Sequence, residues 1–376
     1  MTDPRIDRLA EILVRYSTRV KPGDLVGVTG LPFSPEALPL MQAVAREVLR
    51  AGGHPLPYLE NRFTEGLDRI LYEEGSDDQL TYLEPWAEQI MSSLDCDIKI
   101  MAATNTRRLS GLDSTRIAVH RRSRAELLNL RFKRAAEGAL RWVISLMPTA
   151  AYAQDAEMSL NAFADLVFAG TYADRDDPIA LWRKRSETQA RFVRKFDGKR
   201  TVVVQGPHID LTFSIEGRRF INCDGQRNMP DGEIFTGPVE DSVDGWMEST
   251  FPAIHMGVDV GRVRLRFQDG RAVEAQAEKH QEHLSAMLDS DEGARRIGEF
   301  GIGTNEQIKI FTKNMLFDEK IGGTIHLALG AAYPETGGVN KSGIHWDLLC
   351  DMRDGGTITV DGKRIYESGR FERIGG

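Results

Sequence analysis

Only three cysteines occur in the 376-residue sequence, Cys96, Cys223 and Cys350, and no two of them have CxxC spacing. We therefore expect neither a disulfide framework nor a cysteine-based zinc site. We expect a protein of a reducing compartment, the cytoplasm. The sequence also lacks any apolar run that approaches 18 residues, and its charged N-terminus has no apolar signal-peptide region. Neither a membrane-spanning helix nor a targeting segment is expected.

An excess of positive charge is missing as well. Lys and Arg total 48 against 56 for Asp and Glu, which gives a formal net charge of −8. No overall positive field would attract phosphates, which argues against a general nucleic-acid binder. The phosphate-binding patterns GxGxxG and GxxxxGK[ST] and the nucleophile motif GxSxG are absent too. What remains is a globular composition, with 41% hydrophobic residues, and a length that suggests two domains.

The first half of the sequence alternates predicted helices and strands. The helices cover about 6–16, 36–51, 78–94 and 120–138, and the strands cover 25–30, 54–60, 97–104 and 140–149. This alternation predicts a mostly parallel sheet with helices on its faces. We therefore expect an N-terminal α/β domain over residues 1–195.

The second half is richer in strands. Asp269-Gly270 and Asp361-Gly362 each separate two β-prone runs, which is a hairpin signal, and 201–217 is also strand-rich. Only the short stretch 279–290 has a clear helical pattern. We expect a strand-rich α+β C-terminal domain over residues 196–376.

Several residues of the second half are candidate metal ligands. His345 and Asp347 are two positions apart, so on a strand both would project from the same face; the alternative is a histidine hydrogen-bonded to an aspartate on a sheet face. His326 lies 19 residues upstream in an apolar run flanked by glycines. A lone histidine there is more often a core residue, yet the glycines allow close packing around a site.

Two glutamates have a similar setting. Glu233 follows a Pro-Asp-Gly turn at the head of an apolar run, and Glu299 is flanked by glycines and Phe300. Burying such glutamates is costly unless they are paired or bind a metal, although each could also be an exposed turn residue. The pair His280 and His283 has charged neighbours and is not HExxH, so a solvated helix face is the better interpretation.

Four segments occur in a recognisable order: NMPDGEIFTGPVEDSV, IGEFGIGTN, HLALGAAYPETGG and SGIHWDLL. In these segments, and more loosely along the whole chain, the sequence resembles the aminopeptidase T / aminopeptidase S family of dinuclear metallopeptidases. The resemblance implies a two-domain α/β protein whose C-terminal domain binds the metals. It also implies a homodimer that acts on peptides.

The resemblance assigns the ligands residue by residue. Glu233 matches the family's first glutamate ligand, and Glu299 matches the second, which bridges both metals. His326 matches the first histidine ligand, and His345 and Asp347 match the pair in the last motif. Three carboxylates and two imidazoles suit two divalent ions such as Zn²⁺, Co²⁺ or Mn²⁺.

Tyr333, in the AAYP segment, matches the family's tyrosine near the metals, where a phenol could stabilise an oxyanion. Two ions about 3.5–4 Å apart can activate water and polarise a carbonyl, which fits a metal-dependent aminopeptidase. The connection from Tyr333 to His345 is shorter than in the family, which leaves inherited ideas about specificity open. The general base is not identified; the nearby acids in the sequence are Glu240, Asp241 and Asp244.

Two other functions compete with this prediction. His326, His345 and Asp347 alone form a 2-His-1-carboxylate set, as in a mononuclear Fe(II) ring-cleaving dioxygenase of the dihydroxypyridine type. That chemistry does not need Glu233 and Glu299 as ligands, so their presence in full motifs favours the peptidase. A non-catalytic protein that keeps the fold would be expected to have lost ligands, and none is lost.

Overall fold

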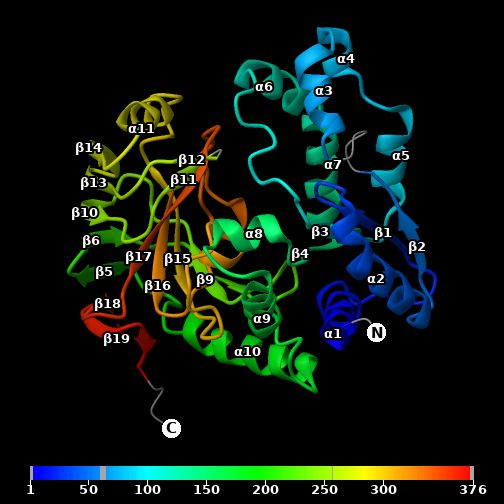
Figure 1. Cartoon of the computed structure of the whole chain (residues 1–376). Helices are drawn as coiled ribbons and strands as arrows, with labels where there is room; N and C mark the ends of the chain where they lie inside the picture. Colours follow the sequence, from blue (N-terminus) through cyan, green and yellow to red (C-terminus); the bar gives the residue numbers. More distant parts are fainter. Residues whose placement is uncertain (1–2, 60–64, 256, 373–376) are drawn as a thin grey trace. The chain divides into compact units, whose positions relative to one another are not determined.

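The structure, a computed structural model, describes residues 3–59, 65–255 and 257–372, and its chain divides into two compact units (Figure 1). Unit 1 comprises Met1–Leu181 and Gly225–Pro230, and unit 2 comprises Trp182–Asp224 and Asp231–Gly376. The expected fold class is confirmed, because a parallel sheet with helices occurs in unit 1 and antiparallel strands dominate unit 2.

Unit 1 is built on a five-stranded parallel sheet in the order β2-β1-β3-β4-β8. Its strands are β1 (Leu25–Gly30), β2 (His54–Pro57), β3 (Cys96–Met101), β4 (Arg141–Leu146) and β8 (Asn228–Met229). β1 and β3 are buried along nearly their whole length, as expected for parallel strands covered on both faces. The predicted strand positions in this half are confirmed.

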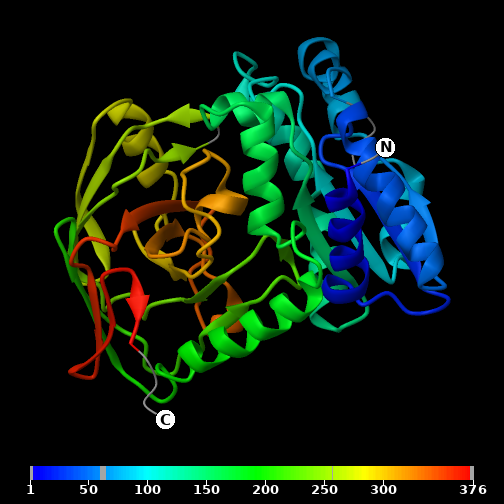
Figure 2. The ribbon, with the colours of Figure 1, turned by 60° about the horizontal axis from the view of Figure 1, so that its bottom comes forward.

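Helices complete unit 1. They are α1 (Pro4–Glu11), α2 (Leu38–Arg50), α3 (Leu67–Glu74), α4 (Asp77–Thr81), α5 (Pro85–Ser93), α6 (Ser114–Ser123), α7 (Ala125–Ala136), α8 (Ala150–Asp155) and α9 (Leu160–Gly170). α1 and α2 pack side by side (Figure 2), and α1 continues as a π-helical turn over Ile12–Ser17. A longer helix, α10 (Pro178–Val193), follows α9 in the chain.

Two predicted helices are each divided in the structure. The stretch 78–94 forms α4 and α5, because Pro85 restricts Glu84 to an extended backbone conformation at the junction. The stretch 120–138 similarly contains the end of α6 and all of α7, which meet at Arg124. The apolar spacing identified the helical regions but not these breaks.

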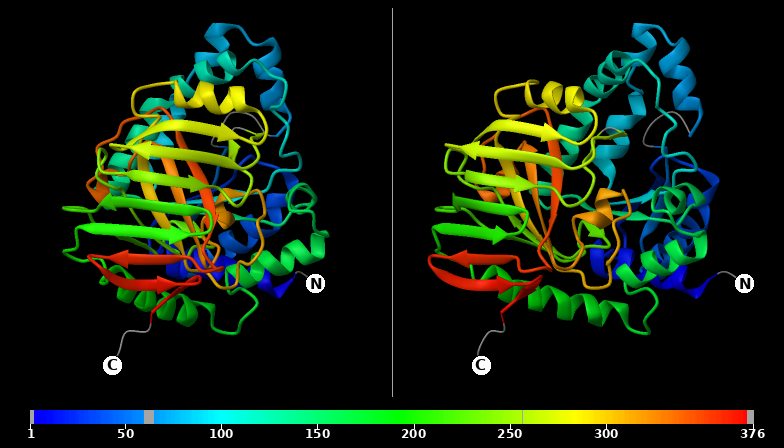
Figure 3. Two further views of the ribbon diagram at one scale, coloured as in Figure 1. Left: turned by 90° about the vertical axis from the view of Figure 1, so that its left-hand side faces the viewer. Right: turned by 60° about the vertical axis from the view of Figure 1, so that its left-hand side comes forward.

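Unit 2 contains an eight-stranded antiparallel sheet in the order β14-β13-β10-β6-β5-β18-β19-β20, whose stacked strands are seen in Figure 3. Its strands are β5 (Thr201–Gly206), β6 (Ile209–Ser214), β10 (Asp244–Glu248), β13 (Val263–Gln268), β14 (Arg271–Ala277), β18 (Thr357–Val360), β19 (Lys363–Glu367) and β20 (Arg370–Phe371). Both predicted hairpins occur: Asp269-Gly270 and Asp361-Gly362 have positive φ at both positions, as a type I′ turn requires.

A second antiparallel sheet of unit 2 has five strands in the order β17-β16-β15-β9-β7. These are β7 (Ile221–Cys223), β9 (Glu233–Thr236), β15 (Ile297–Gly303), β16 (Thr324–Gly330) and β17 (His345–Asp351). The remaining elements are the β11–β12 hairpin (Ile254–His255 and Val258–Asp259), α11 (Gln281–Leu288), α12 (Met315–Asp318) and a 3₁₀ turn at Pro334–Thr336. α11 was predicted, whereas the four-residue α12 is too short to give a periodic pattern.

The core of unit 2 lies between its two larger sheets. Phe300 of β15 meets Phe213 of β6 edge to face, with ring centroids 5.0 Å apart, and Leu327 and Trp346 of the adjacent strands belong to the same core cluster. Successive strand residues point to opposite faces. The residues that alternate with this core on β15, β16 and β17 therefore face away from it, and they include Glu299, His326 and Asp347.

Candidate metal centre

Four neighbouring strands contribute the five candidate ligands. Glu233 begins β9, Glu299 lies in β15, His326 lies in β16, and β17 carries His345 and Asp347. All of these side chains except His345 are buried; the His345 side chain is 28% exposed. Residues far apart in the sequence thus meet on one face of a hydrogen-bonded sheet, which holds their backbones in fixed register.

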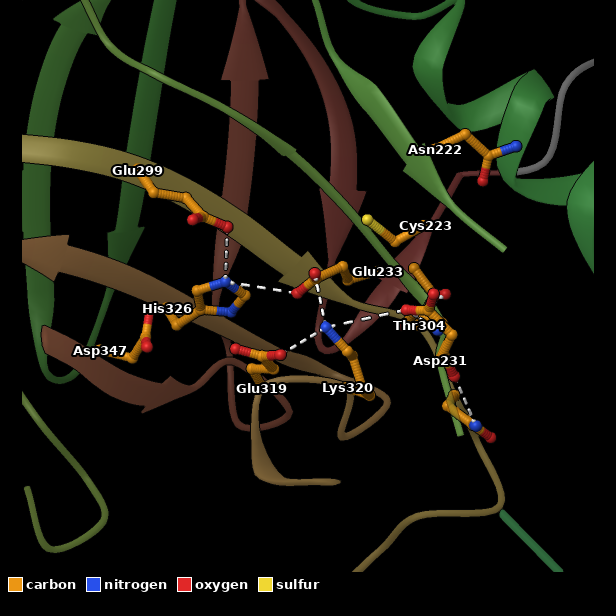
Figure 4. Close-up of polar contacts among 12 residues, drawn as sticks. Asn222, Cys223, Asp231, Glu233, Glu299, Thr304, Glu319, Lys320, His326 and Asp347 are labelled. Carbon is orange, nitrogen blue, oxygen red and sulfur yellow. Dashed lines mark hydrogen bonds and ion pairs between the residues drawn. The ribbon is translucent and has the colours of Figure 1, made fainter. Parts of the chain in front are cut away.

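One group of candidate ligands gathers around His326. Its Nε2 atom lies 3.2 Å from Glu299 Oε1 and 3.4 Å from Glu233 Oε2. Ligand atoms of the three residues all lie within 4.8 Å of one another, a spacing at which a single cation could contact all three. Figure 4 shows the three side chains directed toward one another.

A second group gathers around His345. Its Nε2 atom lies 3.4 Å from Glu299 Oε2 and 3.7 Å from Asp347 Oδ1, and these residues also form a set within 4.8 Å. His345 Nδ1 donates a hydrogen bond to the carbonyl oxygen of Ala331 at 3.0 Å. Because a carbonyl can only accept, this bond fixes the proton on Nδ1 and leaves Nε2 free as a ligand.

Glu299 belongs to both groups. Its Oε1 atom faces His326 and its Oε2 atom faces His345. Two buried carboxylate oxygens nearby, Glu233 Oε2 and Asp347 Oδ1, have no hydrogen-bond partner. An unsatisfied buried carboxylate oxygen is costly, and a bound cation would remove that cost. The residues present therefore fit divalent metal ions.

Gly301 makes room for the His326 ring. The two residues are directly opposite each other in the β15–β16 pairing. A Cβ atom at position 301 would lie 2.1 Å from both Cε1 and Nε2 of His326, which is far too close. Gly301, the second of three glycines in the IGEFGIGTN segment, is therefore a packing requirement of the site itself.

The charges of this cluster shift its proton affinities. Burial raises the pKa of Glu299, whereas burial alone would lower the pKa of His326. The hydrogen bond to Glu299 and the charge of Glu233 outweigh that penalty and raise the pKa of His326 to about 9. Burial likewise opposes the charge on His345, but Asp347 and Glu299 raise its pKa. A cation bound by these side chains would therefore have to compete with protons.

Tyr333 lies beside the His345 group. Its ring centroid is 5.2 Å from that of His345 and 5.3 Å from that of Phe235, both in edge-to-face arrangements. Burial of part of the side chain and the charge of Glu299 raise the pKa of Tyr333. Its phenol therefore keeps its proton at neutral pH, and 42% of the residue remains accessible.

Sequence reasoning missed Glu319 and Lys320, which adjoin the centre (Figure 4). A Glu319 oxygen lies within 4.8 Å of ligand atoms of His326 and Asp347, and Lys320 Nζ contacts Glu233 Oε1 at 2.6 Å. Burial raises the pKa of Glu319 to about 8. The one local signal was the charged run Asp-Glu-Lys directly before the glycine-flanked strand of His326.

The other acids considered from the sequence have different partners. Arg218 binds Glu240 Oε2, and the backbone N–H of Val339 donates to Glu240 Oε1. Asp244 accepts a hydrogen bond from the backbone of Asp269 at a hairpin. These contacts give both residues structural roles in the loops that surround β10.

His280 and His283 form no metal-sized cluster with a third acidic, cysteine or histidine side chain in the part of the chain that the structure describes. His283 instead pairs with His255, with Nε2 and Nδ1 3.3 Å apart, and both rings pack against Trp346. Among the described residues, no helix has both the length and the apolar character needed to cross a bilayer.

Comparison with known proteins places this geometry in context. The family model described as "Thermophilic metalloprotease (M29)" matches residues 2–371. Aminopeptidase 2 of Geobacillus stearothermophilus is 29% identical over 413 aligned residues, which cover 98% of each chain. Among solved structures, wild-type AmpT from Thermus thermophilus superposes with a TM-score of 0.84 at 22% identity, again over 98% of each chain.

A more distant structural likeness was also found. The 2,5-dihydroxypyridine dioxygenase from Pseudomonas putida KT2440 superposes with a TM-score of 0.58 at 14% identity, over 98% of this chain and 97% of that one. At such low identity the likeness concerns the fold alone.

Proposed function

The chain belongs to the thermophilic metalloprotease family M29, and from this membership and the geometry of the site we propose that it is an aminopeptidase with two divalent metal ions per chain. It is a hydrolase of the metallo-aminopeptidase class. Its substrates are peptides from which it removes N-terminal residues. Zn²⁺, Co²⁺ and Mn²⁺ all suit ligands made of carboxylates and imidazoles without thiolates.

The shared position of Glu299 supports this proposal most directly. Its two carboxylate oxygens face different histidines, and each histidine has a further carboxylate neighbour, Glu233 for His326 and Asp347 for His345. A carboxylate between two such groups is the arrangement that a bridging ligand requires. Glu299 would therefore be shared by both ions, with Glu233 and His326 holding one ion and His345 and Asp347 the other.

When bound, a pair of divalent ions would supply Lewis-acid activation of both the water and the scissile carbonyl. The protein contributes orientation. The Ala331 carbonyl fixes the tautomer of His345, and the sheet fixes the spacing of Glu299 from both histidines. This preorganisation means that the ligands do not have to be assembled when substrate arrives.

Tyr333 is the residue we assign to the reacting carbonyl. Its protonated phenol stands beside His345 and is partly accessible, so it can donate a hydrogen bond to the oxygen of a bound substrate. As negative charge develops on that oxygen during attack, the hydrogen bond becomes stronger. Tyr333 would then stabilise the transition state more than the bound peptide.

The mononuclear dioxygenase alternative has weaker support. The structural likeness to the dihydroxypyridine enzyme is lower than that to the AmpT structure, with TM-scores of 0.58 and 0.84. A single iron held by His326, His345 and Asp347 would also leave the buried, unpartnered Glu233 Oε2 without a cation.

Metal content together with hydrolysis of N-terminal amino acid p-nitroanilides tests the proposal. We expect two ions per chain and release of p-nitroaniline that stops on chelation. One iron per chain with ring-opening of a dihydroxypyridine would establish the dioxygenase instead. Hydrolysis that survives thorough chelation, with no metal in the sample, would rule out both.

Two further properties are proposed on other grounds. Cytoplasmic location is supported by the cysteines, since all three are free thiols in the structure. A homodimer is supported by the resemblance to the family, and light scattering on the purified protein would establish its mass in solution.

A further inference from the structure

Lys320 places an ammonium group inside an acidic part of unit 2. The residue is fully buried, and its Nζ atom lies 2.6 Å from Glu233 Oε1, 2.5 Å from Glu319 Oε1 and 3.7 Å from Asp231 Oδ1 (Figure 4). Lysine is almost never fully buried without partners, because removing the charge from water is costly. Three carboxylates around one ammonium offset that cost.

The contact with Glu233 is asymmetric. Lys320 binds Oε1, whereas Oε2 has no hydrogen-bond partner and lies 3.4 Å from His326 Nε2. The lysine therefore fixes the rotation of the carboxylate, with one oxygen held by the ammonium. The other oxygen remains directed toward the His326 group.

Lys320 also occupies a place that another cation could take. Cys223, Asp231 and Glu233 form a further set of potential ligand atoms within 4.8 Å of one another, which has Glu233 in common with the His326 group. The Lys320 ammonium contacts two members of this set, Glu233 at 2.6 Å and Asp231 at 3.7 Å. A covalently attached cation thus lies at the edge of the cluster.

We propose that Lys320 is a positioning residue of the metal centre, which holds Glu233 through Oε1 so that Oε2 is presented to the ion bound by His326. This inference rests on the proposed two-metal function. Lys320 would act through its contact with Glu233 rather than on the substrate. Loss of the ammonium frees the carboxylate to rotate and removes the cation that contacts Oε1.

Titration of the metal-free protein with Co²⁺, followed by calorimetry and by the visible absorption of the ion, tests the inference without measuring activity. In Lys320→Met, which keeps the length of the side chain, affinity for one of the two ions should fall by about 10–100-fold, the range typical of residues that orient a ligand. The other ion should be bound nearly as in the parent. Equal affinities for both ions in variant and parent would overturn the inference.

A double-mutant cycle separates positioning from a general structural effect. If Lys320 acts through Glu233, the Lys320→Met substitution should cost little further Co²⁺ affinity in a Glu233→Gln background. Losses that simply add would contradict the inference. Lys99→Met, at another buried lysine paired with a carboxylate, is the matched control and should leave Co²⁺ binding unchanged.

The parent protein provides a measurement that does not depend on a variant folding. With ¹⁵N-labelled lysine, the Lys320 ammonium should exchange slowly with water, and its NMR signal should shift when Co²⁺ or Zn²⁺ is added. A Lys320 signal that metal leaves unchanged would overturn the inference. Failure of the parent itself to bind two ions would instead count against the proposed function.

Discussion

Unit 1 and unit 2 each enclose a cluster of charged side chains, and the clusters differ in the sign of the charge that is left over. In unit 1, the buried Asp97 Oδ2 has two cations within 3.7 Å, Lys99 Nζ and Arg131 Nε, and Tyr58 donates a hydrogen bond to Oδ1. One carboxylate accompanied by two cations needs no further positive charge. This cluster can be explained as part of the folded structure alone.

The cluster in unit 2 has the opposite balance. Around one lysine and two histidines it contains five carboxylates: Asp231, Glu233, Glu299, Glu319 and Asp347. Carboxylates outnumber the lysine, so negative charge predominates among these side chains, and with neutral histidines divalent ions would balance it. The comparison teaches that the number of buried charges alone does not reveal a metal site. An excess of buried negative charge, combined with carboxylate and imidazole side chains, is what indicates a candidate metal site.

Removal of metal should produce the largest difference between the two units, because only unit 2 is expected to bind metal. Chelation should abolish peptidase activity, and Zn²⁺, Co²⁺ or Mn²⁺ should restore it. Unit 2 should also lose stability, by about 4 kcal/mol for each site previously held at ~1,000 times its Kd. Hydrogen exchange measured with and without chelator should show faster exchange in β9, β15, β16 and β17 and little change in the sheet of unit 1. Equal acceleration in both units would contradict the comparison.

Substitution of the proposed ligands should affect metal affinity differently in the His326 group and the His345 group of unit 2. Glu299→Gln should weaken both ions, because each group loses a shared ligand, whereas Glu233→Gln should mainly weaken one. Each loss should exceed the ~10–100-fold expected for a residue that only orients a ligand. Metal titration of both variants provides the measurement. If each variant lost the same single ion, Glu299 would not be a bridge.

Tyr333→Phe should affect turnover without affecting the charge balance. The ring that packs against His345 and Phe235 is retained, so both metals and the fold should be retained as well. Loss of one hydrogen-bond donor to a developing oxyanion typically lowers kcat by about 10²–10³-fold. Steady-state kinetics should show this loss in kcat rather than in KM. A kcat within a few-fold of that of the parent would show that Tyr333 does not stabilise the oxyanion.

Proton release on metal binding should report the raised pKa of the unit 2 cluster. Below about pH 9 the metal-free protein keeps His326 protonated, and a metal must displace that proton to bind. Apparent affinity should therefore rise as the pH approaches 9, by up to about tenfold per pH unit for each proton released. Calorimetry in buffers of different ionisation enthalpy measures the number of protons. A binding enthalpy independent of the buffer would contradict this expectation.

Asp97→Asn should produce the smallest effect on catalysis and a clear effect on stability. It removes the carboxylate shared by Lys99 and Arg131, and breaking a buried ion pair typically costs about 3–5 kcal/mol. Urea unfolding should show this loss, while metal content and turnover per folded molecule should equal those of the parent. A change in metal stoichiometry would mean that the two clusters are not independent.

Local patterns predicted much of the fold. Short apolar runs between predicted helices located the strands of unit 1, and the two Asp-Gly pairs located hairpins. Both signals depend only on residues that are neighbours in the sequence. β8 could not be predicted, since Asn228–Met229 is too short for a pattern and pairs with the distant β4. The junction before Pro85 was available in the sequence, but the helical spacing on both sides concealed it.

The candidate site, like the fold, has parts that local sequence patterns predict and parts that they do not. The five proposed ligands could be named because they lie in recognisable segments, and the structure brings all five to one face of the sheet. Lys320 gave no such signal: a lysine in a charged run is normally solvated, and its partner Glu233 is 87 positions away. Which charges are buried together depends on strand pairing, and no local pattern contains that information.

The uneven exposure of the two histidines has a consequence for the kinetics of metal exchange. His326 is completely buried, whereas the side chain of His345 is 28% exposed. We therefore expect two ions of unequal lability: the ion beside His345 would leave and be replaced first, while the inner ion would persist through brief dialysis. Preparations loaded with different metals in sequence could then contain mixed pairs, with the order of addition recorded in which metal occupies which position.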